Sequence, residues 1–149
     1  MTKKEFITKS ETETENIGRQ LALSLLNHNK AFIAMRGEMG VGKTAFARGF
    51  ASALGIYNIK SPTYTIVNEH TSGYKTVFHF DMYRIEDSND LYSIGYYDYL
   101  ERDGYIICEW SENISDEIPT DAITVTFVRL PDDENSRKIT IVSEKEILC

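Results

Sequence analysis

Cysteine and long apolar runs are scarce in this chain of 149 residues, and each shortage excludes a class of protein. Its two cysteines are Cys108, inside an apolar run, and Cys149, the last residue; they match no metal-ligand spacing and are weak evidence for a disulfide. No apolar run is long enough to cross a bilayer, and the polar N-terminal residues do not resemble a secretory signal. We therefore expect free thiols and a cytoplasmic protein with no membrane partner.

Basic clusters are also missing. Lys and Arg number 16 against 23 Asp and Glu, which gives a formal net charge of -7, and the basic residues are scattered. Broad binding to the phosphate backbone of a nucleic acid requires a basic surface. The composition therefore argues against DNA binding and makes any role with RNA indirect.

Length and composition suit a single domain over residues 1–149. A chain of this size buries roughly 70% of its unfolded surface on folding. Its 42% hydrophobic and 26% charged residues are ordinary for a soluble protein. We find no repeat, low-complexity segment or linker that would divide it.

The most informative motif is GEMGVGKT at residues 37–44, a phosphate-binding loop signature. Its glycines leave bare backbone whose N–H groups can surround a triphosphate. Lys43 would place an ammonium on the β- and γ-phosphates, and the Thr44 hydroxyl would bind a magnesium ion that bridges the same oxygens. A plain glycine turn between a strand and a helix is the alternative, but it has no need of Lys-Thr after the last glycine.

The flanking segments have the order that this signature requires. Residues 31–35 form an apolar run typical of a buried strand, and residues 45–54 have helical spacing that ends before Gly55. A helix starting at the loop would direct its first N–H groups at the phosphates.

Other segments predict an α/β fold with a mixed, partly antiparallel central sheet in three layers. Ser10 and Glu13 fit a capping box for a first helix that continues through Asn27. We expect strands at residues 6–8, 64–70, 75–80, 105–108, 123–130 and 138–142, a hairpin turn at 71–74, and short helices at 87–92 and 96–102.

Two acidic residues follow predicted strands. Asp81 comes directly after residues 76–80, and Glu109 directly after residues 105–108, so both would reach the carboxyl edge of the sheet. A magnesium site beside a phosphate loop needs such a carboxylate, although solvated carboxylates at strand ends are common. The single tryptophan, Trp110, would pack over the nucleotide, over a partner or in the core.

Two further features are less specific. Thr63 and Thr65, in SPTYT at residues 61–65, would sense a γ-phosphate, or Pro62 would only stiffen the entry to a strand. His70 and His79 alternate with apolar neighbours and have no partner at metal-ligand spacing, which favours a structural role.

Taken together, GEMGVGKTAFARG (37–49), SPTYTIVNEH (61–70), HFDMYR (79–84), GYYDY (95–99) and CEWSE (108–112) resemble the TsaE family, also called YjeE or YdiB. The resemblance spans most of the chain. It implies a small P-loop ATPase, with ATP and Mg²⁺ as cofactors, that is required for N6-threonylcarbamoyladenosine at tRNA position 37. Such a protein acts with TsaD and TsaB, hydrolyses ATP slowly, and meets tRNA only through their complex.

The resemblance also implies roles for individual residues. Lys43, Asp81 and Glu109 would be catalytic, with Thr44, Glu109 and Asp81 at the magnesium and Asp81 as the Walker-B-like acid. Nucleotide would contact Glu11, Gly37, Glu38, Met39, Gly40, Val41, Gly42, Lys43, Thr44, Thr63, Thr65, Trp110 and Arg137. The region around Glu11 to Thr14, together with Arg137, would flank its base end.

Two other functions share the phosphate loop. A small-molecule or nucleotide kinase would need an acceptor site and usually an arginine-bearing lid, and no arginine cluster is present. The second is a GTPase switch, which would usually carry an Asn-Lys-x-Asp motif after a strand that this sequence does not have, or a non-catalytic nucleotide-binding adaptor.

Overall fold

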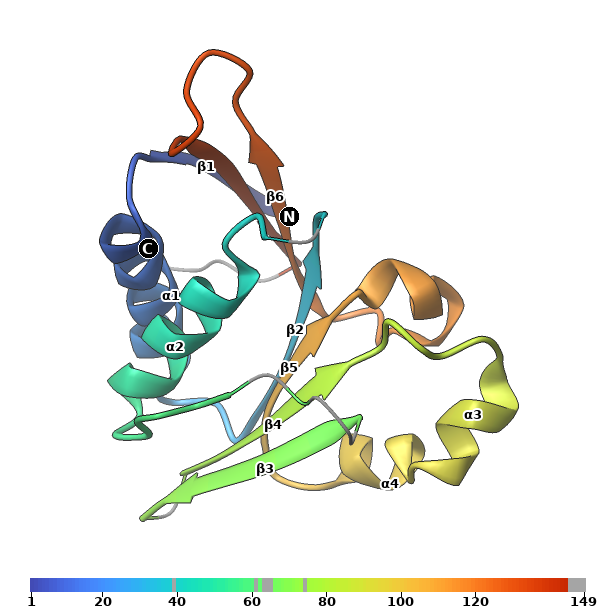
Figure 1. The fold of residues 1–149 in the computed structure, drawn as a ribbon. Coiled ribbons are helices and arrows are strands. Elements are labelled where there is room, and N and C mark those ends of the chain that lie inside the picture. The colour runs from blue at the N-terminus through green and yellow to red at the C-terminus, as the bar shows by residue number, and fades with distance from the viewer. Residues whose placement is uncertain (39, 61, 63–65, 74, 145–149) are drawn as a thin grey trace.

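The structure is a computed structural model that describes residues 1–38, 40–60, 62, 66–73 and 75–144. Its middle layer is a seven-stranded sheet with the order β1-β7-β6-β2-β5-β4-β3 (Figure 1). The strands are β1 (Thr2–Thr8), β2 (Lys30–Arg36), β3 (Val67–Ser72), β4 (Lys75–Asp81), β5 (Gly104–Glu109), β6 (Ile123–Arg129) and β7 (Arg137–Ser143). Strands β6, β2, β5 and β4 are parallel, whereas β7, β1 and β3 pair antiparallel. The predicted mixed sheet is confirmed.

Helices cover both faces of this sheet (Figure 1). On one side lie α1 (Glu11–Ser24) and α2 (Lys43–Ala53), and on the other α3 (Ser88–Ser93), α4 (Tyr96–Glu101) and the 3₁₀ helix η1 (Ser111–Glu117). Each face has its own core: Ile107 packs in the cluster of α1 and α2, and Cys108 in the cluster of α3 and α4. Successive residues of a strand point to opposite faces, so β5 is buried along its whole length and reads as a continuous apolar run.

The first helix begins as predicted but ends earlier. Ser10 caps it by accepting a hydrogen bond from the Glu13 N–H at 3.2 Å, and Glu13 reaches back to the Lys9 N–H. The helix ends at Ser24, not Asn27, and residues 25–27 form turns.

The hairpin is also tighter than expected, because β3 continues to Ser72 and β4 begins at Lys75. Helix η1 was not predicted. Its segment carries no helical apolar period, and it packs on the sheet through Ile114.

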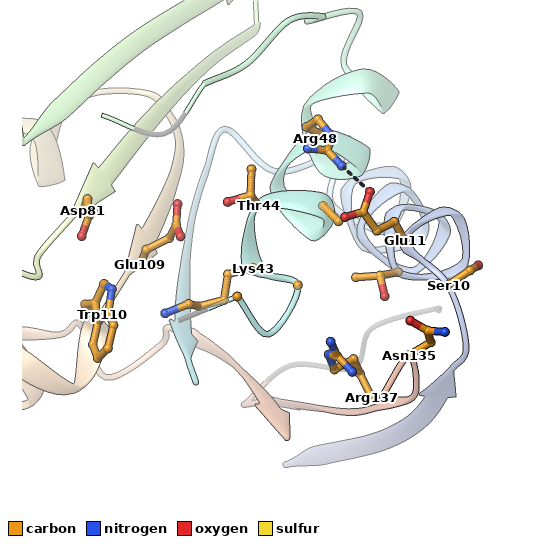
Figure 2. Close-up of a pocket in the computed structure, with 14 residues that line it drawn as sticks. Ser10, Glu11, Lys43, Thr44, Arg48, Asp81, Glu109, Trp110, Asn135 and Arg137 are labelled. Atoms are coloured by element: carbon orange, nitrogen blue, oxygen red, sulfur yellow. Dashed lines mark hydrogen bonds and ion pairs between the residues drawn. The ribbon is translucent and has the colours of Figure 1, made fainter. Parts of the chain in front are cut away.

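Two glycines let α1 and α2 approach each other closely. A Cβ atom on Gly49 would lie 1.9 Å from the Glu15 carbonyl oxygen, and one on Gly18 would lie 2.2 Å from the Phe46 carbonyl oxygen. Because α2 begins at the phosphate loop, this contact places the N-terminus of α1 beside that loop (Figure 2).

Within the described part of the chain, no helix has both the length and the apolar character needed to cross a membrane.

Candidate functional site

A cavity of about 380 Å³ opens where the phosphate loop, the starts of α1 and α2, the ends of β4 and β5, and the turn before β7 meet (Figure 2). Parallel strands deliver their carboxyl ends to one edge of a sheet, which is where such sites form in α/β proteins. The lining residues are Ser10, Glu11, Thr14, Gly40, Gly42, Lys43, Thr44, Ala45, Arg48, Asp81, Glu109, Trp110, Asn135 and Arg137.

The loop turns into α2 through Gly42, which has φ 109° and is the N-cap residue. That backbone conformation strains any residue with a Cβ atom, and glycine provides no side chain to cap the helix. The start of α2, from Lys43 to Ala45, therefore faces the cavity with the positive end of the helix dipole.

Lys43 extends across the cavity toward β5 (Figure 2). Its Nζ donates to the Gly37 carbonyl oxygen at 2.7 Å and lies 4.1 Å from the centroid of the Trp110 ring. Burial lowers the pKa of Lys43, while the negative charges of Glu109, Glu112 and Asp81 oppose that shift.

Trp110 has φ 58°, which is rare for a non-glycine residue. This left-handed turn follows directly after β5, and the indole packs against Tyr83 at 5.0 Å between ring centroids as well as against Lys43. The conformation thus places an aromatic wall beside the carboxylate of the preceding residue.

Asp81 and Glu109 are register partners at the ends of β4 and β5, so their side chains lie on the same face. Burial raises the pKa of Asp81, its hydrogen bond from the Tyr83 N–H lowers it, and repulsion from Glu109 raises it further. Glu109 is 6% exposed. Two adjacent carboxylates at a cavity wall are suited to holding a cation between them.

The donor set fits magnesium. Thr44, Asp81 and Glu109 offer oxygen atoms around one cavity, and the described residues include no cluster of three or more His, Cys, Asp or Glu side chains that would cage a metal. Magnesium usually takes one or two carboxylates, retains waters and completes its shell with substrate phosphates.

Glu109 also contacts His79, a buried residue on the neighbouring strand β4. His79 Nε2 lies 2.5 Å from Glu109 Oε2, and His79 is fully buried. From the sequence alone we expected only a structural role for His79, because its partner, Glu109, lies on another strand.

The end of the cavity away from Asp81 and Glu109 is polar. Arg48 pairs with Glu11 at 3.5 Å and with Glu15 at 3.1 Å. Asn135, in the turn before β7, and Arg137, the first residue of β7, line the same end of the cavity (Figure 2).

A family model described as "Threonylcarbamoyl adenosine biosynthesis protein TsaE" matches residues 8–139. This chain belongs to the TsaE family. It is 35% identical over 119 residues to the Bacillus subtilis tRNA threonylcarbamoyladenosine biosynthesis protein TsaE, covering 78% of this chain and 74% of the relative. The Aquifex aeolicus TsaE protein is 34% identical over 143 residues, with 93% and 95% covered.

The fold agrees with that assignment. A crystal structure of Bacillus subtilis YdiB superposes with a TM-score of 0.73 at 27% identity, over 97% of this chain and 87% of that one.

Several residues that the sequence singled out meet in the cavity of this TsaE-family chain: Glu11, Gly40, Gly42, Lys43, Thr44, Asp81, Glu109, Trp110 and Arg137. Three others do not line it. Val41 is fully buried in the core, Glu38 pairs with Arg129 outside, and Gly37 contributes its carbonyl to Lys43. Met39, Thr63 and Thr65 lie outside the described residues, and their roles stay predictions.

Thr14, in the region expected at the base end, also lines the cavity, whereas sequence reasoning missed four lining residues: Ser10, Ala45, Arg48 and Asn135. One signal was available, since Arg48 follows Thr44 by four residues on the same helix and so lies on the same side. The position of Asn135 depends on the pairing of β6 with β7, which no local pattern specifies.

Proposed function

We propose that this TsaE-family chain binds ATP with magnesium and hydrolyses it slowly, as the ATP-dependent component for N6-threonylcarbamoyladenosine formation at tRNA position 37. It would act through TsaD and TsaB homologues. The observation that carries the proposal is one cavity that joins a phosphate loop to two strand-end carboxylates. Its volume falls in the range of roughly 300–1,000 Å³ that ligand pockets occupy.

At the phosphate end, the N–H groups at the start of α2 would bind the β- and γ-phosphates. Lys43 would leave the Gly37 carbonyl and place its ammonium on the same oxygens. Partial burial strengthens that charge interaction, because the local dielectric is lower than in water.

Magnesium would neutralise charge that develops on the phosphates. Thr44 and Glu109 would hold it, with Asp81 beside them. The raised pKa of Asp81, caused first by burial, suits a group that orients or accepts a proton from an attacking water.

At the other end, Glu11 and Arg137 would flank the base and ribose. Arg48 is held by Glu11 and Glu15 at the cavity wall, so it would contribute positive charge along the nucleotide without a large movement.

Membership of the TsaE family supports the pathway, and the net charge of -7 supports an indirect link to tRNA through partner proteins. We propose phosphate release and not transfer to an acceptor, since two strand-end acids lie beside the phosphate loop, and the two described arginines of the cavity wall, Arg48 and Arg137, lie on α2 and β7 and not on a separate lid.

The test compares wild type with Lys43→Ala. Wild type should bind magnesium-ATP and release phosphate slowly, whereas the variant should keep its melting temperature and lose binding. Phosphoryl transfer to nucleosides or sugars at a rate above phosphate release would indicate a kinase instead. Equal ATP binding by the variant would also overturn the proposal.

A further inference from the structure

The strands of this site carry one buried, polar side chain to which the proposed ATPase chemistry gives no role. His79 is 0% exposed, lies in the middle of the β4 run, and is two residues before Asp81. Residues two apart on a strand point to the same face, so His79 and Asp81 share the side on which α2 packs.

Glu109 is the partner that fixes the orientation of this ring. Strands β4 and β5 are parallel and pair Asp81 with Glu109 and His79 with Ile107, so Glu109 lies diagonally across from His79 on the same face. His79 Nε2 lies 2.5 Å from Glu109 Oε2, and in the proposed magnesium-bound state, in which Glu109 is a carboxylate that only accepts, the ring would donate from Nε2.

His79 Nδ1 is buried and has no hydrogen-bond partner among the described residues. A histidine kept for packing alone gains nothing from leaving one nitrogen unpaired in the core, because burying a polar atom without a partner costs free energy. Among the described residues, Glu109 is the hydrogen-bonding partner of this ring, while Asp81 and His70 interact with it electrostatically.

We propose that His79 is a positioning residue for magnesium: it holds one oxygen of Glu109 and thereby fixes the carboxylate plane toward the metal. This inference rests on the proposed function, in which Glu109 binds the ion. Without the donor, Glu109 would turn toward the Lys43 ammonium, which already interacts with it electrostatically. Residues that orient a metal ligand typically change metal affinity roughly 10–100-fold when removed.

Three substitutions of His79 distinguish a role in orienting Glu109 from a role in core packing. In His79→Gln the amide nitrogen reaches the place of Nε2 and keeps the donor. In His79→Asn an amide of the same chemistry stops near Nδ1 and cannot reach Glu109. His79→Leu fills similar volume with no donor.

The experiment titrates magnesium into each purified full-length variant that is saturated with a non-hydrolysable ATP analogue, and follows Trp110 fluorescence or heat. Nucleotide affinity in EDTA and melting temperature are measured in parallel. We expect magnesium affinity to fall roughly tenfold or more in the Asn and Leu variants and to stay near wild type in Gln. Metal-free nucleotide affinity should be unchanged in all three.

Wild-type magnesium affinity in the Asn variant would overturn the positioning role, as would equal losses of magnesium and metal-free nucleotide binding. Failure of all three variants to fold would show that His79 is structural. If wild type itself bound neither nucleotide nor magnesium, the proposed function would fail, and the role of His79 with it.

Discussion

Several polar side chains of this molecule are buried and keep one defined partner. Tyr96 donates its hydroxyl to the Glu117 carbonyl oxygen at 2.8 Å, and burial raises its pKa. Cys108 lies in the core on the face opposite to Glu109, and burial followed by the charge of Glu109 raises the pKa of its thiol. Such groups stay protonated because the charged form would be buried without compensation.

Because the Cys108 thiol is buried and protonated, it should react slowly with thiol reagents. In a Cys149→Ser variant, native protein at pH 9 should show no fast reaction with a thiol reagent, whereas guanidinium should expose one thiol per chain. Unfolded thiols ionise near about pH 8.5 while the folded thiol stays neutral, so the contribution of this group to stability is present below that pH and declines above it. Fast labelling of the native variant would contradict the buried position.

The positions of cavity residues were predictable where the signal is local, and their roles stay predictions. Lys43 and Thr44 follow from an octapeptide, and Asp81 and Glu109 from their places after apolar runs. The contact of His79 with Glu109 was not predictable, because it joins residues 30 positions apart through the register of two strands.

At the scale of elements, the packing of α1 on α2 shapes the site. The phosphate loop opens α2, Ser10 and Glu11 open α1, and the close contact at Gly18 and Gly49 holds these ends together. A larger residue at the crossing would separate the helices and widen the cavity.

Gly49→Ala tests this packing. Alanine favours an isolated helix by about 1 kcal/mol over glycine, but here its Cβ atom would overlap the Glu15 carbonyl. We expect a net loss of roughly 1–3 kcal/mol in the free energy of unfolding, measured by chemical denaturation. An increase in stability would show that the helices are not so close.

Whether a segment forms a helix or a strand was predictable from its apolar periodicity, and a helix end was predictable where a capping residue marks it. Ser10 was predictable as an N-cap because its signal lies within four residues, and the early end at Ser24 was not, because the apolar stripe continues beyond it. Strand β1 extends from Thr2 to Thr8, longer than residues 6–8, since pairing with β7 stabilises polar positions that lack a strand signal.

The net negative charge of the whole molecule limits the kinds of partner that it can bind directly. A net charge of -7 over 149 residues opposes direct binding to a polyanion. The order of strands, with β2 between β5 and β6, could not be read from the sequence, because it depends on long-range pairing.

The isolated chain should therefore not bind tRNA at about 0.15 M salt, a concentration at which surface charges are screened beyond roughly 8 Å. A gel-shift or filter assay with unmodified tRNA measures this, with the TsaD–TsaB complex as the positive control. Saturable binding by the chain alone, weakening steeply with salt, would contradict the indirect role.

As proposed, ATP chemistry at this cavity supports tRNA modification by partner proteins. The most direct measurement is N6-threonylcarbamoyladenosine formation by TsaD and TsaB with tRNA and a threonylcarbamoyl-adenylate source, with wild type, with Glu109→Gln, or without this chain. We predict repeated turnover with wild type only, while the variant remains folded. Equal product formation without the chain or with the variant would show that ATP chemistry at this cavity does not support the modification.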